Sequence, residues 1–168
     1  VNIMEDYYSG EFYQQILEQW IRENLDLIST IPKDLTTKLE STIMDGFVGG
    51  ASVRDIAGDI ERICKTNKSR ARFIARDQIG KLQSRISQHQ QEDAGVEEYV
   101  WSTSQDSRVR DSHRRLNRKK FRWDDPPVVD PKTGRRCHPG EDYGCRCVAL
   151  PVFNLNITLP WEKRSEEK

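Results

Sequence analysis

The stretch CHPGEDYGCRC, residues 137–147, contains three of the four cysteines of this chain. Cys145 and Cys147 are two residues apart, so their side chains point to the same side of an extended backbone. The proline and glycine at positions 139 and 140 allow the backbone to fold back toward Cys137. Such a cluster forms a metal site, a disulfide or a turn with free thiols, and each choice holds the C-terminal part of the chain together differently.

Zinc is the metal that this arrangement predicts. A zinc ion takes four ligands with Zn–S bonds of about 2.3 Å, so two cysteine sulfurs on one ion lie about 3.8 Å apart. Cys137 or His138 can supply a third ligand beside the two sulfurs of Cys145 and Cys147, and a helix predicted earlier in the chain supplies a histidine as the fourth. We therefore expect zinc on a set that joins helix, loop and strand, namely His113, Cys137, Cys145 and Cys147.

Two other interpretations of the cysteines remain open. A disulfide from Cys137 to Cys145 or Cys147 would form outside the cell, and free thiols in a turn need no partner. The chain has no basic start followed by an apolar stretch and a cleavage site, which favours reduced thiols and metal ligands over disulfides. Cys64 continues the apolar side of a predicted helix, so we expect a small buried hydrophobic residue there.

The composition indicates one domain with a thin core. The chain has 168 residues, of which 35% are hydrophobic and 32% charged, and its mean hydropathy is −0.81. Such a polar chain favours elongated helices, or surfaces that are buried only against partners. The chain begins with Val1 rather than methionine, which indicates a processed protein or a piece of a longer one. We expect no membrane segment, because no run approaches the ~18 apolar residues that a membrane helix requires.

The charges are segregated along the chain, although the formal net charge is zero. Residues 1–30 contain six acidic residues against one arginine, whereas residues 108–122 contain eight basic residues against one aspartate. Segregation of this kind is typical of solvated faces that pair with each other or with a neighbouring subunit. The zero net charge gives no overall field that would attract nucleic acid or membrane.

The first two thirds of the chain read as three to four helices. Apolar residues recur at spacings of three and four over residues 11–28, 33–48, 52–64 and 69–93. Ser52 stands three residues before Asp55, which predicts a capping box at the start of the third helix. The fourth helix has a narrow apolar seam that consists of Ala75, Ile79, Leu82 and Ile86. A seam this narrow predicts that the helix packs against one neighbouring element.

The pattern changes after Gly95, which ends the last of these helices. Residues 96–104 alternate and predict a strand, residues 107–117 a short basic helix, and residues 145–153 a second strand. Residues 123–136 contain too much proline and aspartate for regular structure. We therefore expect an α+β protein with a helical N-terminal region (1–67), a small mixed module (68–153) and a charged tail (154–168) that orders only on a partner.

Four motifs in order resemble the C-terminal module of the phage Mu F-like minor head proteins, the head morphogenesis family of tailed phages. They are ARDQ (75–78), GVEEYVWSTSQDSRVRDSHRRLN (95–117), FRWDDPP (121–127) and HPGEDYGCRCVALPVF (138–153). Upstream, WIRENLDLISTIP (20–32) and GGASVRDIAGDI (49–60) resemble the helical region before that module. One departure is that Asn117 and Arg118 stand where a glycine is expected; asparagine tolerates the left-handed conformation, so a turn is still expected.

The resemblance implies a minor capsid or head morphogenesis protein that acts in head assembly at the portal vertex. It further implies synthesis in the host cytoplasm, a place in the virion head, and ejection with the DNA as an open alternative. The implied partners are the portal protein and other head proteins in a multi-subunit assembly, with packaged DNA as a further contact.

The residues that we expect to matter are architectural, and we expect no enzyme. Four of them form a predicted interlocking polar core that Trp101 and Trp123 cover, namely Asp106, Arg108, Arg110 and His113. A basic set contacts DNA phosphates or a partner, or else forms ion pairs within the chain, namely Arg114, Arg115, Arg118, Lys119 and Lys120. The alternatives are a small nuclease or toxin-like domain that uses the acid, base and cations around His113, and a non-specific nucleic-acid-binding module with a steep salt dependence.

Overall fold

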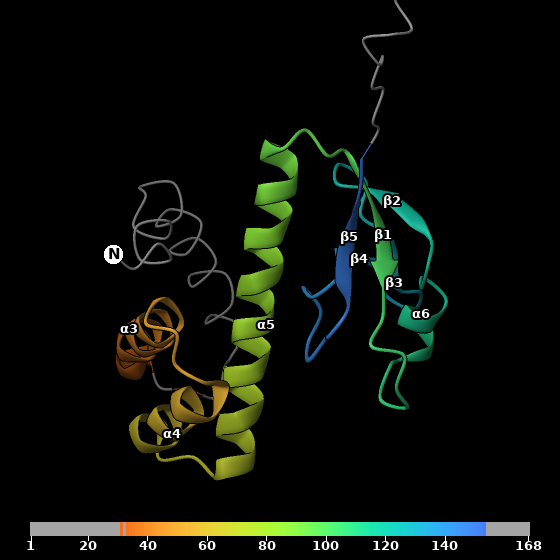
Figure 1. Ribbon diagram of the computed structural model, residues 1–168. Coiled ribbons are helices and arrows are strands. Elements are labelled where there is room, and N and C mark those ends of the chain that lie inside the picture. Colours follow the sequence, from red (N-terminus) through yellow and green to blue (C-terminus); the bar gives the residue numbers. More distant parts are fainter. Residues whose placement is uncertain (1–30, 32, 154–168) are drawn as a thin grey trace, which may run out of the picture.

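The computed structural model describes residue 31 and residues 33–153. Within them, the three long helices occupy one part of the molecule, and the short strands with a short helix occupy another (Figure 1). Three helices come first, α3 (Lys33–Val48), α4 (Val53–Cys64) and α5 (Lys68–Asp93). The elements that follow are β1 (Glu98–Ser102), α6 (Asp111–Arg114), β2 (Lys120–Arg122), β3 (Val128–Asp130), β4 (Arg135–Arg136) and β5 (Val148–Val152). The predicted α+β class is confirmed, whereas the helix predicted over residues 11–28 and the charged tail lie outside the described residues.

The helical layer forms where the apolar spacing predicts it. At the start of α4, Ser52 accepts a hydrogen bond from the Asp55 backbone N–H, and the Asp55 carboxylate accepts one from the Ser52 N–H, so the predicted capping box is present. The apolar sides of α3, α4 and α5 meet in one core, whose most buried members include Leu39, Ile43, Ile56, Ile60 and Leu82. None of the helices in the described part of the chain combines the length and apolar character needed to cross a membrane.

Helix α5 is the central element, because it separates the other two helices from the strands (Figure 1). The predicted seam from Ala75 to Ile86 is buried against α3 and α4. The prediction that α5 packs against one neighbour is wrong, since it also contacts β5 and the loop before it. Polar side chains make that second contact: Gln91 donates to the Ala149 carbonyl at 3.1 Å, and Ser84 donates to the Pro139 carbonyl.

The strands form two small antiparallel sheets. Strand β1 is central in the first, between β2 and β5, with Tyr99 opposite both Phe121 and Pro151. Tyr99 and Trp101 on β1 are fully buried and form the centre of a second core. The predicted strands at β1 and β5 are confirmed, whereas β2 was not predicted, because three residues with two exposed basic side chains carry no periodic signal.

The prediction of an irregular loop over residues 123–136 is wrong, because β3 and β4 pair within it as a hairpin. The turn forms because the Asp130 carboxylate accepts hydrogen bonds from the Lys132 N–H and the Thr133 hydroxyl. Gly134 follows with a φ of 72°, a conformation that glycine adopts without strain. The predicted basic helix over residues 107–117 is also shorter than expected, since only Asp111–Arg114 are helical.

The turn between α6 and β2 forms where a glycine was expected, but not through Asn117. Arg118 takes the left-handed conformation, with a φ of 65°. The side-chain oxygen of Asn117 instead accepts hydrogen bonds from the Thr103 N–H at 3.0 Å and the Thr103 hydroxyl at 3.1 Å. Asparagine therefore joins the turn to the end of β1, and the arginine bears the backbone strain.

We expect Arg118→Gly to stabilise the protein. A left-handed non-glycine residue costs about 1–2 kcal/mol, and the greater freedom of glycine in the unfolded chain offsets part of the gain, which leaves about 0.5 kcal/mol. The melting temperature should rise by about 1–2 °C in a calorimetric scan. Arg118→Ala removes the same charge but keeps a β-carbon, so an equal rise in that variant would contradict the backbone explanation.

Candidate metal centre

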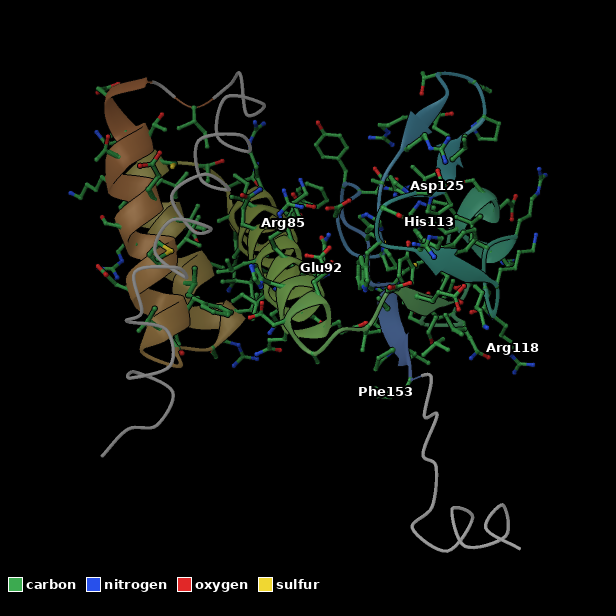
Figure 2. All side chains as sticks on the ribbon, turned by 90° about the horizontal axis from the view of Figure 1, so that it is seen from above. Arg85, Glu92, His113, Arg118, Asp125 and Phe153 are labelled. Carbon is green, nitrogen blue, oxygen red and sulfur yellow. The ribbon has the colours of Figure 1, made fainter. Side chains whose placement is uncertain are left out.

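Three of the four predicted zinc ligands lie together inside the module. Figure 2 shows His113 among the strands and loops on the far side from α3 and α4. Its Nδ1 atom is 3.5 Å from the Cys145 sulfur and 3.6 Å from the Cys147 sulfur. His113 comes from α6 and the cysteines from the loop that leads into β5, so the cluster joins segments about thirty residues apart in sequence.

The His113 ring is fixed from two sides. Its Nε2 atom lies 3.0 Å from the Asp142 carboxylate, and the edge of the ring meets the Trp101 ring with centroids 5.5 Å apart. A carboxylate on one ring nitrogen directs the other nitrogen to a metal, which is the usual arrangement of histidine ligands. The Nδ1 atom of His113 is thereby turned toward the two sulfurs.

Asp142 is the hub of the site and was not predicted from the sequence. Its side chain is 3% exposed and interacts with three cationic partners: Arg110 at 3.0 Å, His113 at 3.0 Å and Arg135 at 2.7 Å. Burial opposes its ionisation, but the hydrogen bond from His113, the Tyr143 N–H and the two arginines hold the pKa of Asp142 at about 2. The carboxylate is therefore ionised at neutral pH.

Hydrogen bonding shifts the pKa values of the two thiols of the cluster in opposite directions. The pKa of Cys145 falls to about 4, because the Cys147 thiol and then His113 hydrogen-bond to its sulfur. The pKa of Cys147 rises for the matching reason, since it donates to Cys145 and is buried. Hydrogen bonds with Asp142 and then Cys145 raise the pKa of His113 to about 9. The cluster thus provides a thiolate that an adjacent imidazolium stabilises.

Cys137 and His138, the two other predicted ligand candidates, do not join this group. Cys137 is half-buried at the margin of the aromatic core, where burial and the nearby carboxylate of Asp142 raise the pKa of its thiol to about 12. His138 accepts or donates a hydrogen bond at 2.8 Å with the Tyr99 hydroxyl, and its ring lies against Trp123. All four cysteines are free thiols in the structure.

The four residues of the predicted polar core are divided between two networks. Arg110 and His113 meet on Asp142, as described above. Asp106 instead forms a double hydrogen bond with Arg146, at 2.5 and 2.7 Å. The exposed Arg108 donates its backbone N–H to the Asp106 carboxylate and forms an ion pair with it at 3.6 Å. Arg146 was missed, although its place between two inward-pointing cysteines directs its side chain the opposite way.

The two tryptophans do not cover these networks jointly. Trp101 packs against His113, whereas Trp123 stacks near Tyr99, with ring centroids 4.3 Å apart.

The predicted basic set is partly neutralised within the chain. Arg114 lies 3.9 Å from Asp111, and Lys120 lies 3.4 Å from Glu98. The other three residues are exposed and have no ion pair within residues 33–153, namely Arg115, Arg118 and Lys119. Figure 2 shows Arg118 pointing outward on the side of the module away from α5. Three cations on the turn between α6 and β2 are therefore available for a partner.

A small cavity adjoins the cluster. Its volume is about 60 Å³, and its walls include the three ligand residues together with Arg108, Arg110 and Arg146. Such a space is large enough for an ion with a solvent molecule. Cys145 and Cys147 also line a larger cleft of about 460 Å³ beside α5, which His113 does not line. The site is therefore suited to binding an ion that holds the module together.

Comparison with known proteins agrees with the sequence motifs. A protein of Haemophilus influenzae, named only as an uncharacterized protein, is 38% identical over 133 residues. The match covers 79% of this chain but 28% of that relative, so the chain spans less than a third of the relative's length. No solved structure matches. The sequence model of the phage Mu protein F like family matches residues 37–150, which are more than half of the chain and include every element from α4 to β4. The chain therefore belongs to the phage Mu protein F like family.

Proposed function

We propose that this chain is a minor structural protein of the head of a tailed phage or prophage, made in the host cytoplasm and assembled at the portal vertex. The observation that carries the proposal is the family match over residues 37–150, which includes both the helical layer and the metal-centre module. The family connects the chain with head morphogenesis and with other head proteins. We further propose that its role is architectural and not enzymatic.

The outer face of β5 supports assembly with another head protein. Val148 and Leu150 lie on one face of this strand and are 54% and 49% exposed, and Phe153 directly after it is 59% exposed. In the sheet order β2-β1-β5, the outer edge of β5 lies against α5, where Gln91 donates to the Ala149 carbonyl, so the exposed feature is the apolar side chains and not the strand edge. Exposed apolar side chains that lie together mark a surface for a partner, and the portal protein is the partner that we propose.

The experiment is deletion of the gene in the phage or prophage that carries it. We expect loss of DNA-filled heads in electron micrographs, and we expect mass spectrometry of purified wild-type particles to find the chain at a few copies per portal. Normal particles without the chain would overturn the proposal. Recovery of the chain from newly infected cells would show that it is ejected with the DNA.

We also propose that the exposed cations of the α6–β2 turn contact packaged DNA. Arg115, Arg118 and Lys119 have no ion pair within the described residues, which leaves their charges available to phosphates. Each phosphate contact releases about one counterion, so the slope of log K against log salt changes by about 0.9 for each contact. Replacing all three with glutamine should therefore make the slope less steep by about 3 in a fluorescence titration of duplex DNA.

The matched control changes three exposed cations on the helical layer, Arg54, Lys68 and Arg72, to glutamine. This variant loses the same formal charge and should keep the slope of the wild type. An equal effect in both variants would contradict a local contact. The labelled duplex should also remain intact with and without magnesium, since cleavage would favour the nuclease alternative over an architectural role.

A further inference from the structure

We propose that His113, Cys145 and Cys147 bind a zinc ion through Nδ1 and two sulfurs, with a solvent molecule from the adjoining cavity in the fourth position. The inference rests on the geometry of the module and is independent of the role in head assembly. An ion here would join α6 to the loop before β5.

The distances fit a tetrahedral zinc ion. With Zn–N near 2.0 Å and Zn–S near 2.3 Å, a tetrahedral angle places the nitrogen and the sulfur about 3.5 Å apart. The observed distances from His113 Nδ1 are 3.5 Å to Cys145 and 3.6 Å to Cys147. All three ligand atoms lie within 4.8 Å of one another. Little movement is needed to admit the ion, and one nitrogen with two thiolates is a set that zinc favours.

The surroundings favour bound metal and negative sulfur. Asp142 holds the far nitrogen of His113 at 3.0 Å, which orients Nδ1 toward the ion. The Cys147 backbone N–H points at the Cys145 sulfur at 3.4 Å, as donors around metal thiolates do. The indole N–H of the fully buried Trp101 has no hydrogen-bond acceptor among the described residues, and Trp101 packs in the same core as Cys147.

The small core of the module is a further argument for a bound ion. Its buried core contains Tyr99, Trp101, Trp123, Val129 and Cys147, and its strands are two to five residues long. A core of this size contributes little stability, and small folds commonly add a metal for this reason. Because a zinc site rarely exists in the unfolded chain, its binding energy becomes folding energy.

The test is elemental analysis of the full chain, purified and dialysed under reducing conditions. We expect one zinc per chain in the wild type and in Cys64→Ser, the matched control on α4, and none in Cys145→Ser or Cys147→Ser. Removing the metal with a chelator should lower the melting temperature of the wild type, and added zinc should restore it in a concentration-dependent manner. A wild type without zinc, or a Cys145→Ser variant that keeps it, would overturn the site.

A second measurement, on folded wild-type protein, counts the thiolate ligands and does not depend on whether the Cys145→Ser and Cys147→Ser variants fold. Cobalt(II) titrated into the metal-free chain should give the charge-transfer absorption of two thiolates and the strong visible bands of a tetrahedral ion. Cys137→Ser should keep both the zinc and the same spectrum. Loss of zinc in Cys137→Ser, or a third thiolate band in the wild type, would overturn the assignment of the fourth position to solvent.

Discussion

Replacing Asp142 with asparagine is expected to lower the free energy of unfolding by about 3 kcal/mol, because it leaves the buried imidazolium of His113 without its counter-charge. The Asp142 side chain is 3% exposed and neutralises Arg110, His113 and Arg135. Asparagine keeps the size and one acceptor oxygen but removes the charge. The expected result is a lower urea midpoint with an unchanged slope, measured by tryptophan fluorescence at neutral pH.

The matched control is Asp124→Asn. Asp124 also binds an arginine, with its carboxylate 2.8 Å from Arg122 Nε, but both side chains are largely exposed. Solvent and salt screen such a pair, so its loss should barely move the midpoint. Equal losses in the two variants would show that Asp142 acts only as another surface charge. Loss of zinc together with stability in Asp142→Asn would show that it also orients His113.

The helices could be predicted because their signals are local. The apolar spacing of α3, α4 and α5 and the capping box of Ser52 with Asp55 depend on residues within one or two turns of each other. The buried polar face of α5 gave no such signal. Gln91 is buried and Ser84 is half-buried because β5 and the loop at Pro139 pack against that face, and polar residues on a helix otherwise indicate solvent.

The sequence predicted three of the residues that gather at the candidate site, but not the residues that hold them in place. The spacing of Cys145 and Cys147 and the position of His113 identified three groups that the structure brings together. Asp142 and Arg146 were missed because the partners that define their roles, His113 for Asp142 and Asp106 for Arg146, lie 29 and 40 residues away in sequence. Cys137 was included because it is close in sequence, and it is the fold of the loop that keeps its sulfur outside the group.

Gly140→Ala is expected to cost about 3 kcal/mol, because it strains the loop and forces it away from α5. Gly140 has a φ of 88°, and a β-carbon there would lie 2.7 Å from the Ser84 β-carbon and 2.8 Å from its hydroxyl oxygen. The alanine therefore combines left-handed strain with a clash against a helix. Urea unfolding measures the loss, and the hydrogen bond from Ser84 to the Pro139 carbonyl should break with it.

Gly134→Ala separates the two contributions. Gly134 has a φ of 72° but no atom within 4 Å of an added β-carbon, so this variant should lose only the strain, about 1 kcal/mol. Ser84→Gly removes the clashing atoms, and it should therefore restore stability in the Gly140→Ala background while it destabilises the wild type by about 1 kcal/mol. Equal losses in Gly140→Ala and Gly134→Ala would mean that the loop can leave α5 at no cost. A larger loss at Gly140 means that α5 holds the loop in place, and that the helical layer determines the position of the cysteines that follow it.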